Sequence, residues 1–230
     1  MANPALLNNV DHKDLRIITS RARQYGDAVM STLTFPAEFR DLQAHYPIVF
    51  RKTADGTSFE PLALFGFQEE ENLFLSSDAW DASYVPLLIQ RQPLLIGKVG
   101  DELMMNIDLD HPRVNKTEGE FLFLPHGGIS EFLERMNSIL LQIHEGLQST
   151  PAFVAALMEH QLLESFVLDV ELADGSQNRL AGFYTINEEK LHGLPGSVLE
   201  RFNQLGYLQA IYMVIASISN FRALIERKNR

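Results

Sequence analysis

The sequence predicts an α+β fold, a mainly antiparallel sheet with C-terminal helices packed against it. Two Asp-Gly pairs, Asp55-Gly56 and Asp174-Gly175, each separate two apolar runs. Such a pair is typical of a hairpin turn, because glycine accepts the positive φ that these turns need. A parallel sheet would need helical crossovers at these places, so we expect antiparallel strands.

Short apolar or alternating runs supply the expected strands. Residues 166–172 alternate between apolar and polar side chains, which indicates a strand with one buried face. The strands expected on these grounds are 48–52, 60–67, 72–75, 94–99, 102–108, 166–172 and 180–186.

Helix signals are clearest in the second half of the chain. Ser130 begins a helix with a one-sided apolar stripe. Thr150 and Pro151 are residue types typical of the N-cap and the first turn, so they predict the start of a further helix that runs to about Gln161. The stripe of the first of these helices consists of Phe132, Leu133, Met136, Ile139, Leu140, Ile143 and Leu147.

The last helix, from Gly206 to Lys228, is apolar on nearly every side between Tyr207 and Ala216. A helix of this kind has to be buried in a protein or in a membrane. Its unbroken apolar run is about half as long as a membrane-spanning helix requires. We therefore expect a core helix, or one that completes its burial against a second copy of the chain.

The second possibility predicts a homodimer, because twofold dimers are the commonest assemblies of such chains. The last helix narrows after Ala216 to an apolar stripe, and the side chains expected at the contact are Ile218, Phe221 and Ile225.

Composition excludes several classes of protein. The net charge of −11 argues against nucleic acid as a partner, because phosphates would repel the chain. The chain has no cysteine, which removes disulfides and thiolate chemistry and fits a reducing compartment. We see no signal peptide at the N-terminus and no transmembrane window, so the protein is expected to be cytoplasmic.

No linker rich in Pro, Ser or Gly divides the chain. We therefore expect a single domain over residues 1–230. Residues 1–27 are polar and mixed, and the sequence allows them to be less ordered than the rest.

Two small clusters carry polar chemistry, and each also has a structural interpretation. The first consists of Asp108, Asp110 and His111. Its carboxylates and imidazole suit a hard cation or an acid/base group, or they form a solvated strand end. His126-Gly127-Gly128 leads into a helix N-terminus, where free amides suit an anion, or the glycines only permit a tight turn.

A third group is aromatic and basic. Trp80, Tyr84 and Arg91 are spaced so that they share one face if this segment is helical, and Trp, Tyr and Arg are typical of binding hot spots. The same three residue types also occur on helices that cover a sheet. No nucleophile elbow, phosphate loop or dinucleotide fingerprint occurs in the chain.

Several short pieces together make the chain similar to the SapC family of bacterial proteins. They cover most of the sequence from about residue 30 onward. The pieces are 46–52, 71–75, 80–86 with 91–93, 119–123, 182–191, 206–212 and 217–221.

The resemblance implies an accessory role. The family takes its name from a surface-layer (S-layer) gene context, and relatives tend to be encoded beside flavin-dependent halogenase-like proteins, cupin-like oxygenases and TonB-dependent receptors. The resemblance implies a role in a surface-layer, export, uptake or protein-modification system. It identifies no catalytic residues in this chain.

We therefore expect a non-enzymatic accessory or interaction protein without a cofactor. Its partners would be proteins such as a flavin-dependent halogenase-like enzyme or a cupin-like oxygenase. The alternative is an enzyme or small-ligand sensor whose site surrounds Trp80, Tyr84, Arg91 and the His126-Gly127-Gly128 turn.

Overall fold

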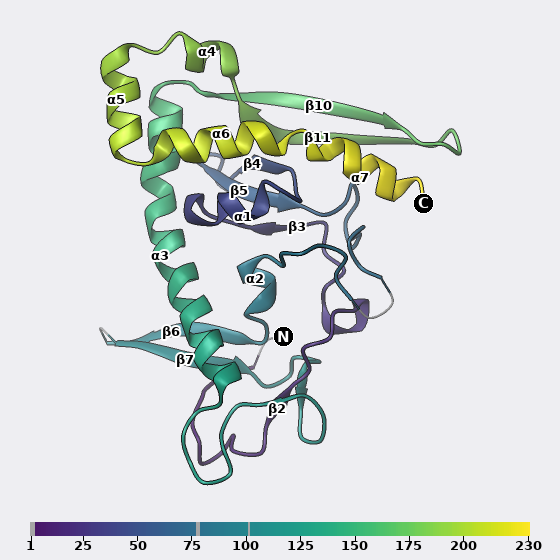
Figure 1. The fold of residues 1–230 in the computed structure, drawn as a ribbon, viewed down its shortest axis with the longest axis vertical. Coiled ribbons are helices and arrows are strands. Elements are labelled where there is room, and N and C mark those ends of the chain that lie inside the picture. Colours follow the sequence, from purple (N-terminus) through teal and green to yellow (C-terminus); the bar gives the residue numbers. More distant parts are fainter. Residues whose placement is uncertain (1–2, 77–78, 101) are drawn as a thin grey trace. The chain divides into compact units, whose positions relative to one another are not determined.

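The computed structural model describes residues 3–76, 79–100 and 102–230 (Figure 1). The chain divides into two compact units, and neither is a continuous stretch. Because the units are interleaved along the sequence, no linker marks them, and the expectation of one domain stays a prediction. The first unit comprises Met1–Ala28, Leu75–Asp81 and Leu87–Glu145, and the second comprises Val29–Phe74, Ala82–Pro86 and Gly146–Arg230.

The α+β prediction is confirmed. The chain is 34% helix and 26% strand. Within the described residues, every pair of neighbouring strands is antiparallel. The C-terminal helices α6 (Tyr207–Ser217) and α7 (Asn220–Lys228) belong to the second unit, and α6 packs on its sheet.

The second unit is built on a five-stranded sheet whose order is β10-β11-β4-β5-β3. The two Asp-Gly turns close its β4–β5 and β10–β11 hairpins, as predicted. Hydrogen bonds from Thr53 and Thr57 lower the pKa of Asp55 to about 2 and hold the first turn. The strands are β3 (Ser31–Leu33), β4 (Ile48–Lys52), β5 (Phe59–Leu64), β10 (Leu163–Glu171) and β11 (Gln177–Ile186).

The strand expected at 72–75 does not form. Asn72 instead accepts a hydrogen bond from the Phe74 amide through its side chain, which turns the chain. Only Leu75 retains an isolated bridge.

One continuous helix, α3 (Glu131–Glu159), replaces the two that the sequence predicts. Ser130 caps it by accepting the Leu133 amide, as expected. Thr150 is not an N-cap, because its hydroxyl donates to the Gly146 carbonyl inside the helix. Pro151 removes one helical N–H without ending the helix.

Gly146 rather than Leu147 continues the buried stripe of α3. Leu147 is exposed, whereas Gly146 is buried. A Cβ on Gly146 would lie 2.2 Å from the ring of Phe35, so only glycine allows this ring to pack against the helix.

In the second unit, the 3-10 helix η2 (Pro36–Glu38) leads directly into α1 (Phe39–Leu42). The helices α4 (Glu188–His192) and α5 (Gly196–Gln204) connect β11 to α6. Helix α6 crosses β4 and β11, and it also contacts α1 (Figure 1).

The last helix is interrupted between α6 and α7 at residues 218–219. The interruption follows Ser217, a fully buried residue whose hydroxyl oxygen accepts the Ile48 amide at 2.9 Å. The side-chain amide of Asn220 donates to the carbonyls of Gln43 and Tyr46. The polar residues of this apolar segment therefore bind backbone groups of the chain around β4.

The segment Tyr207–Lys228 is long and apolar enough, by length and composition alone, to cross a membrane. The sequence did not lead us to expect this, because we counted only its unbroken apolar run. A helix in a protein core passes the same test. In this chain 33% of the tested 18-residue window is buried, and Ile211, Val214 and Leu224 of the segment are almost completely buried.

The first unit contains two three-stranded sheets, with the orders β1-β7-β6 and β8-β2-β9. Residues 1–27, which the sequence allows to be less ordered, contribute β1 and β2, and their partners lie far along the chain. The strands are β1 (Pro4–Leu6), β2 (Arg16–Ile17), β6 (Leu94–Val99), β7 (Glu102–Asp108), β8 (Val114–Asn115) and β9 (Glu120–Phe121). A 3-10 helix, η1 (Arg23–Tyr25), follows β2.

A buried ion pair stabilises the first unit. Arg113 and Asp27 are almost fully buried, and the guanidinium donates to the carboxylate at 2.5 Å. Arg113 also donates to the carbonyls of Ile18 and Ser20, and Arg21 pairs with the second oxygen of Asp27. Removing one partner of such a group leaves the other buried and unpaired.

The burial of Phe221 yields the first prediction. Its ring is 7% exposed and packs edge-on against Phe166 at 5.8 Å, so it is a core residue within one chain. Phe221→Glu should therefore lower the free energy of unfolding by at least about 3 kcal/mol, measured by urea denaturation.

Ile225, which is only partly buried, serves as the matched position. Ile225→Glu should keep most of the free energy of unfolding of the wild type. Light scattering that compares the mass of this variant with the mass of the wild type tests the expected homodimer. A Phe221→Glu protein as stable as the wild type would contradict the packing described here.

Candidate functional site

Trp80, Tyr84 and Arg91 do not share a helical face. Helix α2 spans only Leu87–Gln90, so the helical prediction for these residues is wrong. Pro86 disfavours a helical conformation at the residue before it, and the helix begins only after it.

The predicted ligand residues also fall in different units. Trp80, Arg91 and the 126–128 turn belong to the first unit, and Tyr84 belongs to the second. Trp80 is buried and bridges to Leu75.

Arg91 has a structural contact. Its guanidinium donates to the carbonyl of Leu94 at 2.8 Å, and burial lowers its pKa. In the part of the chain that the structure describes, no carboxylate pairs with it.

The His126-Gly127-Gly128 turn closes on itself. Both glycines have positive φ, at 88° and 91°. The Gly127 amide donates to the Leu124 carbonyl, and the Leu124 amide donates to Gly128. The amide of Gly127 is therefore engaged within the turn, while His126 is exposed.

The Asp108–His111 cluster is engaged in a turn as well. Asp108 accepts the amides of Asn3 and Asp110, and the ring of His111 accepts the Arg113 amide. Among residues 3–76, 79–100 and 102–230, no group of three metal-binding side chains comes together.

Sequence reasoning missed a buried acid in the second unit. Glu38 is 2% exposed, and its carboxylate accepts the hydroxyl of Thr34 at 2.7 Å and that of Tyr84 at 3.0 Å. The hydroxyl of Tyr46 donates to the Tyr84 carbonyl. These contacts hold residues 82–86 against η2 and α1. The sequence signal was an acid placed directly before Phe39 in the short helix expected from Pro36.

This environment raises the pKa of Tyr84. Burial of the hydroxyl is the main cause, and the negative charge of Glu38 adds to it. An ionised Tyr84 would be both poorly solvated and repelled, so the folded chain favours the neutral phenol.

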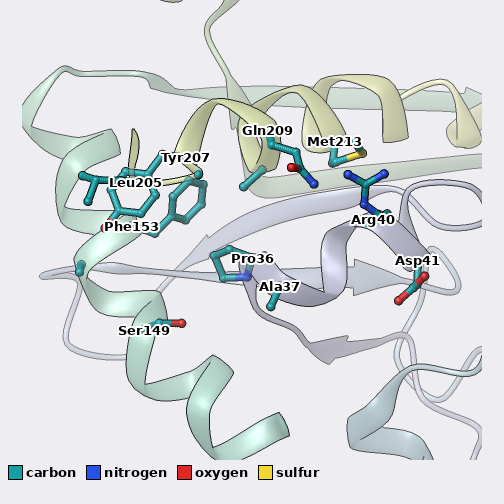
Figure 2. A pocket seen from close by; sticks show the side chains of 13 residues that line it. Pro36, Ala37, Arg40, Asp41, Ser149, Phe153, Leu205, Tyr207, Gln209 and Met213 are labelled. Atoms are coloured by element: carbon teal, nitrogen blue, oxygen red, sulfur yellow. The ribbon is translucent and has the colours of Figure 1, made fainter. Parts of the chain in front are cut away.

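The second unit also contains an open cleft of about 510 Å³, which Figure 2 shows from close by. Its sides come from η2 and α1, from the second half of α3, and from the start of α6. Sequence reasoning missed it because its residues come from segments far apart in the chain. The lining residues are Pro36, Ala37, Arg40, Asp41, Ser149, Ala152, Phe153, Leu205, Gly206, Tyr207, Gln209, Ala210 and Met213.

Aromatic rings form one end of the cleft. Phe153 is fully buried, and Tyr207 packs edge-on against it at 5.3 Å. Phe202 supports Tyr207 from behind, with a centroid distance of 5.9 Å. Beside these rings, Leu205 is 51% exposed. We call Pro36, Phe153, Leu205 and Tyr207 the apolar end of the cleft.

The opposite end carries polar groups. Arg40 extends from α1 toward α6, where Gln209 and Met213 project from consecutive turns (Figure 2). We call Arg40 and Gln209 the polar end of the cleft.

Comparison with known families decides which family the chain belongs to. The SapC family model matches residues 7–224 of the 230. The chain belongs to the SapC family. No curated protein and no solved structure matches it.

The SapC match spans both units and includes every residue that lines the cleft. The cleft is therefore part of the region that the family model describes.

The raised pKa of Tyr84 makes stability depend on pH in the alkaline range. The unfolded chain loses the Tyr84 proton near pH 10, whereas the folded chain keeps it to higher pH. Stability from this residue is thus present below pH 10 and lost as the pH rises above it.

The urea midpoint of Tyr84→Phe should fall less between pH 9 and 11 than the urea midpoint of the wild type. Tyr212→Phe, at a half-exposed ring on α6, is the control and should behave as the wild type does. Equal slopes for the wild type and Tyr84→Phe would contradict the raised pKa of the buried Tyr84 hydroxyl.

Proposed function

We propose that this SapC-family chain is a non-enzymatic accessory protein that binds a protein partner through the cleft of its second unit. One observation carries the proposal. The accessible lining of the cleft combines Tyr207, Met213 and Arg40, and aromatic residues, Met and Arg are the types enriched at protein interfaces.

The surroundings of the cleft support this use. Leu205, which lines the cleft, and Tyr212, on α6, are 51% and 50% exposed. Large apolar side chains that remain exposed next to an open cleft provide area that a partner can bury.

The alternative of an enzyme or ligand sensor has less support. The hydroxyl of Tyr84 donates to Glu38, and Arg91 donates to a carbonyl. Polar groups engaged in this way hold the fold together, and a substrate would have to displace their present partners.

For the partner we propose a flavin-dependent halogenase-like protein or a cupin-like oxygenase, met in the cytoplasm. This follows from the family resemblance, which implies an accessory role in a surface-layer, export, uptake or protein-modification system. The cysteine-free composition is compatible with that compartment.

The test blocks the cleft and measures co-purification with the halogenase-like and cupin-like oxygenase proteins of the same organism. Ala152 lines the cleft on α3, and Ala155 is exposed on the same helix but does not line it. Ala152→Arg should lower recovery of the partner about tenfold or more. The new arginine side chain fills the apolar end of the cleft, so the partner loses several contacts there.

Ala155→Arg adds the same charge to the same helix and should leave recovery unchanged. Equal recovery with the wild type and Ala152→Arg would contradict the proposed binding site.

A further inference from the structure

We infer that the cleft recognises a protein segment in which one carboxylate lies next to a large apolar side chain. Arg40 binds the carboxylate, and the apolar end, around Leu205 and Tyr207, takes the side chain. This inference rests on the proposed function and specifies the chemistry of the partner.

The free charge of Arg40 is the first support. Its side chain makes no ion pair or hydrogen bond with any residue in the described ranges. It nevertheless lies on an otherwise largely apolar cleft in a chain with thirty acidic and nineteen basic residues. A guanidinium that forms no ion pair in such a chain is available to a carboxylate from outside.

Asp41 also lines the cleft but does not pair with Arg40. Consecutive residues of a helix point about 100° apart, and the two side chains diverge in Figure 2. No ion pair joins them within the described residues.

Gln209 supplies a second donor. Its amide makes no hydrogen bond within the described residues, and it lines the same end of the cleft as Arg40. Arginine binds carboxylates through two parallel N–H groups, and an adjacent amide can donate to the remaining lone pairs.

Helix α6 runs past both ends of the cleft. Tyr207 begins α6 at the apolar end, and Met213 lies between one and two turns further along the same helix, on the side toward which Arg40 extends (Figure 2). A segment bound along this part of α6 therefore passes both Tyr207 and Arg40.

Net charge restricts the segment further. The chain carries −11, so a run of acidic residues would be repelled outside the cleft. Screening limits this repulsion to about 8 Å at physiological salt, and a single carboxylate at Arg40 gains a direct contact. The preferred segment thus has one acid beside an apolar residue.

The test measures binding of fluorescein-labelled hexapeptides in which Phe, Leu or Trp precedes a single Asp. Each peptide has a partner with Asn in place of Asp. The wild-type chain should bind at least one Asp peptide about tenfold more tightly than its Asn partner, as expected for a charge-assisted pair. A second set, ending in Phe with a free or an amidated C-terminus, distinguishes a side-chain carboxylate from a chain end.

Arg40→Gln should abolish the preference for the carboxylate. Arg222→Gln is the matched control, because Arg222 is exposed on α7 and does not line the cleft. The control should keep the preference of the wild type.

Three results would overturn the inference. They are equal binding of the acid and amide peptides, an unchanged preference in Arg40→Gln, and no binding of any peptide up to 1 mM. Tighter binding of decanoate than of every peptide would also overturn it, because the occupant would then be a fatty acid.

Co-purification separates this inference from the proposed function. If the partner is retained by Arg40→Gln and lost with Ala152→Arg, the carboxylate inference fails and the proposed function stands. If the peptides discriminate through Arg40 but neither candidate partner co-purifies, the proposed function fails alone.

Discussion

The second unit depends on the backbone of residues 46–50, where several segments meet. The Ile48 amide donates to the hydroxyl of Ser217, and the side-chain amide of Asn220 donates to the Tyr46 carbonyl. The hydroxyl of Tyr46 in turn donates to the carbonyl of Tyr84. Pairing of β11 with β4 reaches only as far as Phe50, so the serine takes the place of a strand partner for Ile48. This junction fixes the end of α6, and through α6 it positions Tyr207 and Met213 in the cleft.

These contacts also give a physical meaning to the family resemblance. The matching pieces around residues 46–52, 80–86 and 217–221 bind one another in the structure. They form a core junction, and the buried acid Glu38 completes it through Tyr84. The polar residues in these pieces thus stabilise the fold, and the available binding groups lie on the cleft beside it.

Local signals made much of the fold predictable. The Asp-Gly turns and the Ser130 cap are decided by a few neighbouring residues, and they formed as expected. The packing of Gly146 on α3 and the interruption after Ser217 involve distant partners, Phe35 for the glycine and Ile48 for the interruption. The cleft and the burial of Glu38 also join segments far apart in sequence, so no spacing pattern indicated them.

The central claim is that the cleft is where a protein partner binds, and photo-crosslinking in the native cell tests it most directly. A photoreactive residue at Met213 lies in the cleft, and one at Ala216 lies exposed on the same helix outside it. The account predicts a crosslink to a protein from position 213 that Ala152→Arg removes, with little from position 216. Crosslinks from 216 alone, or crosslinks from 213 that survive Ala152→Arg, would contradict it.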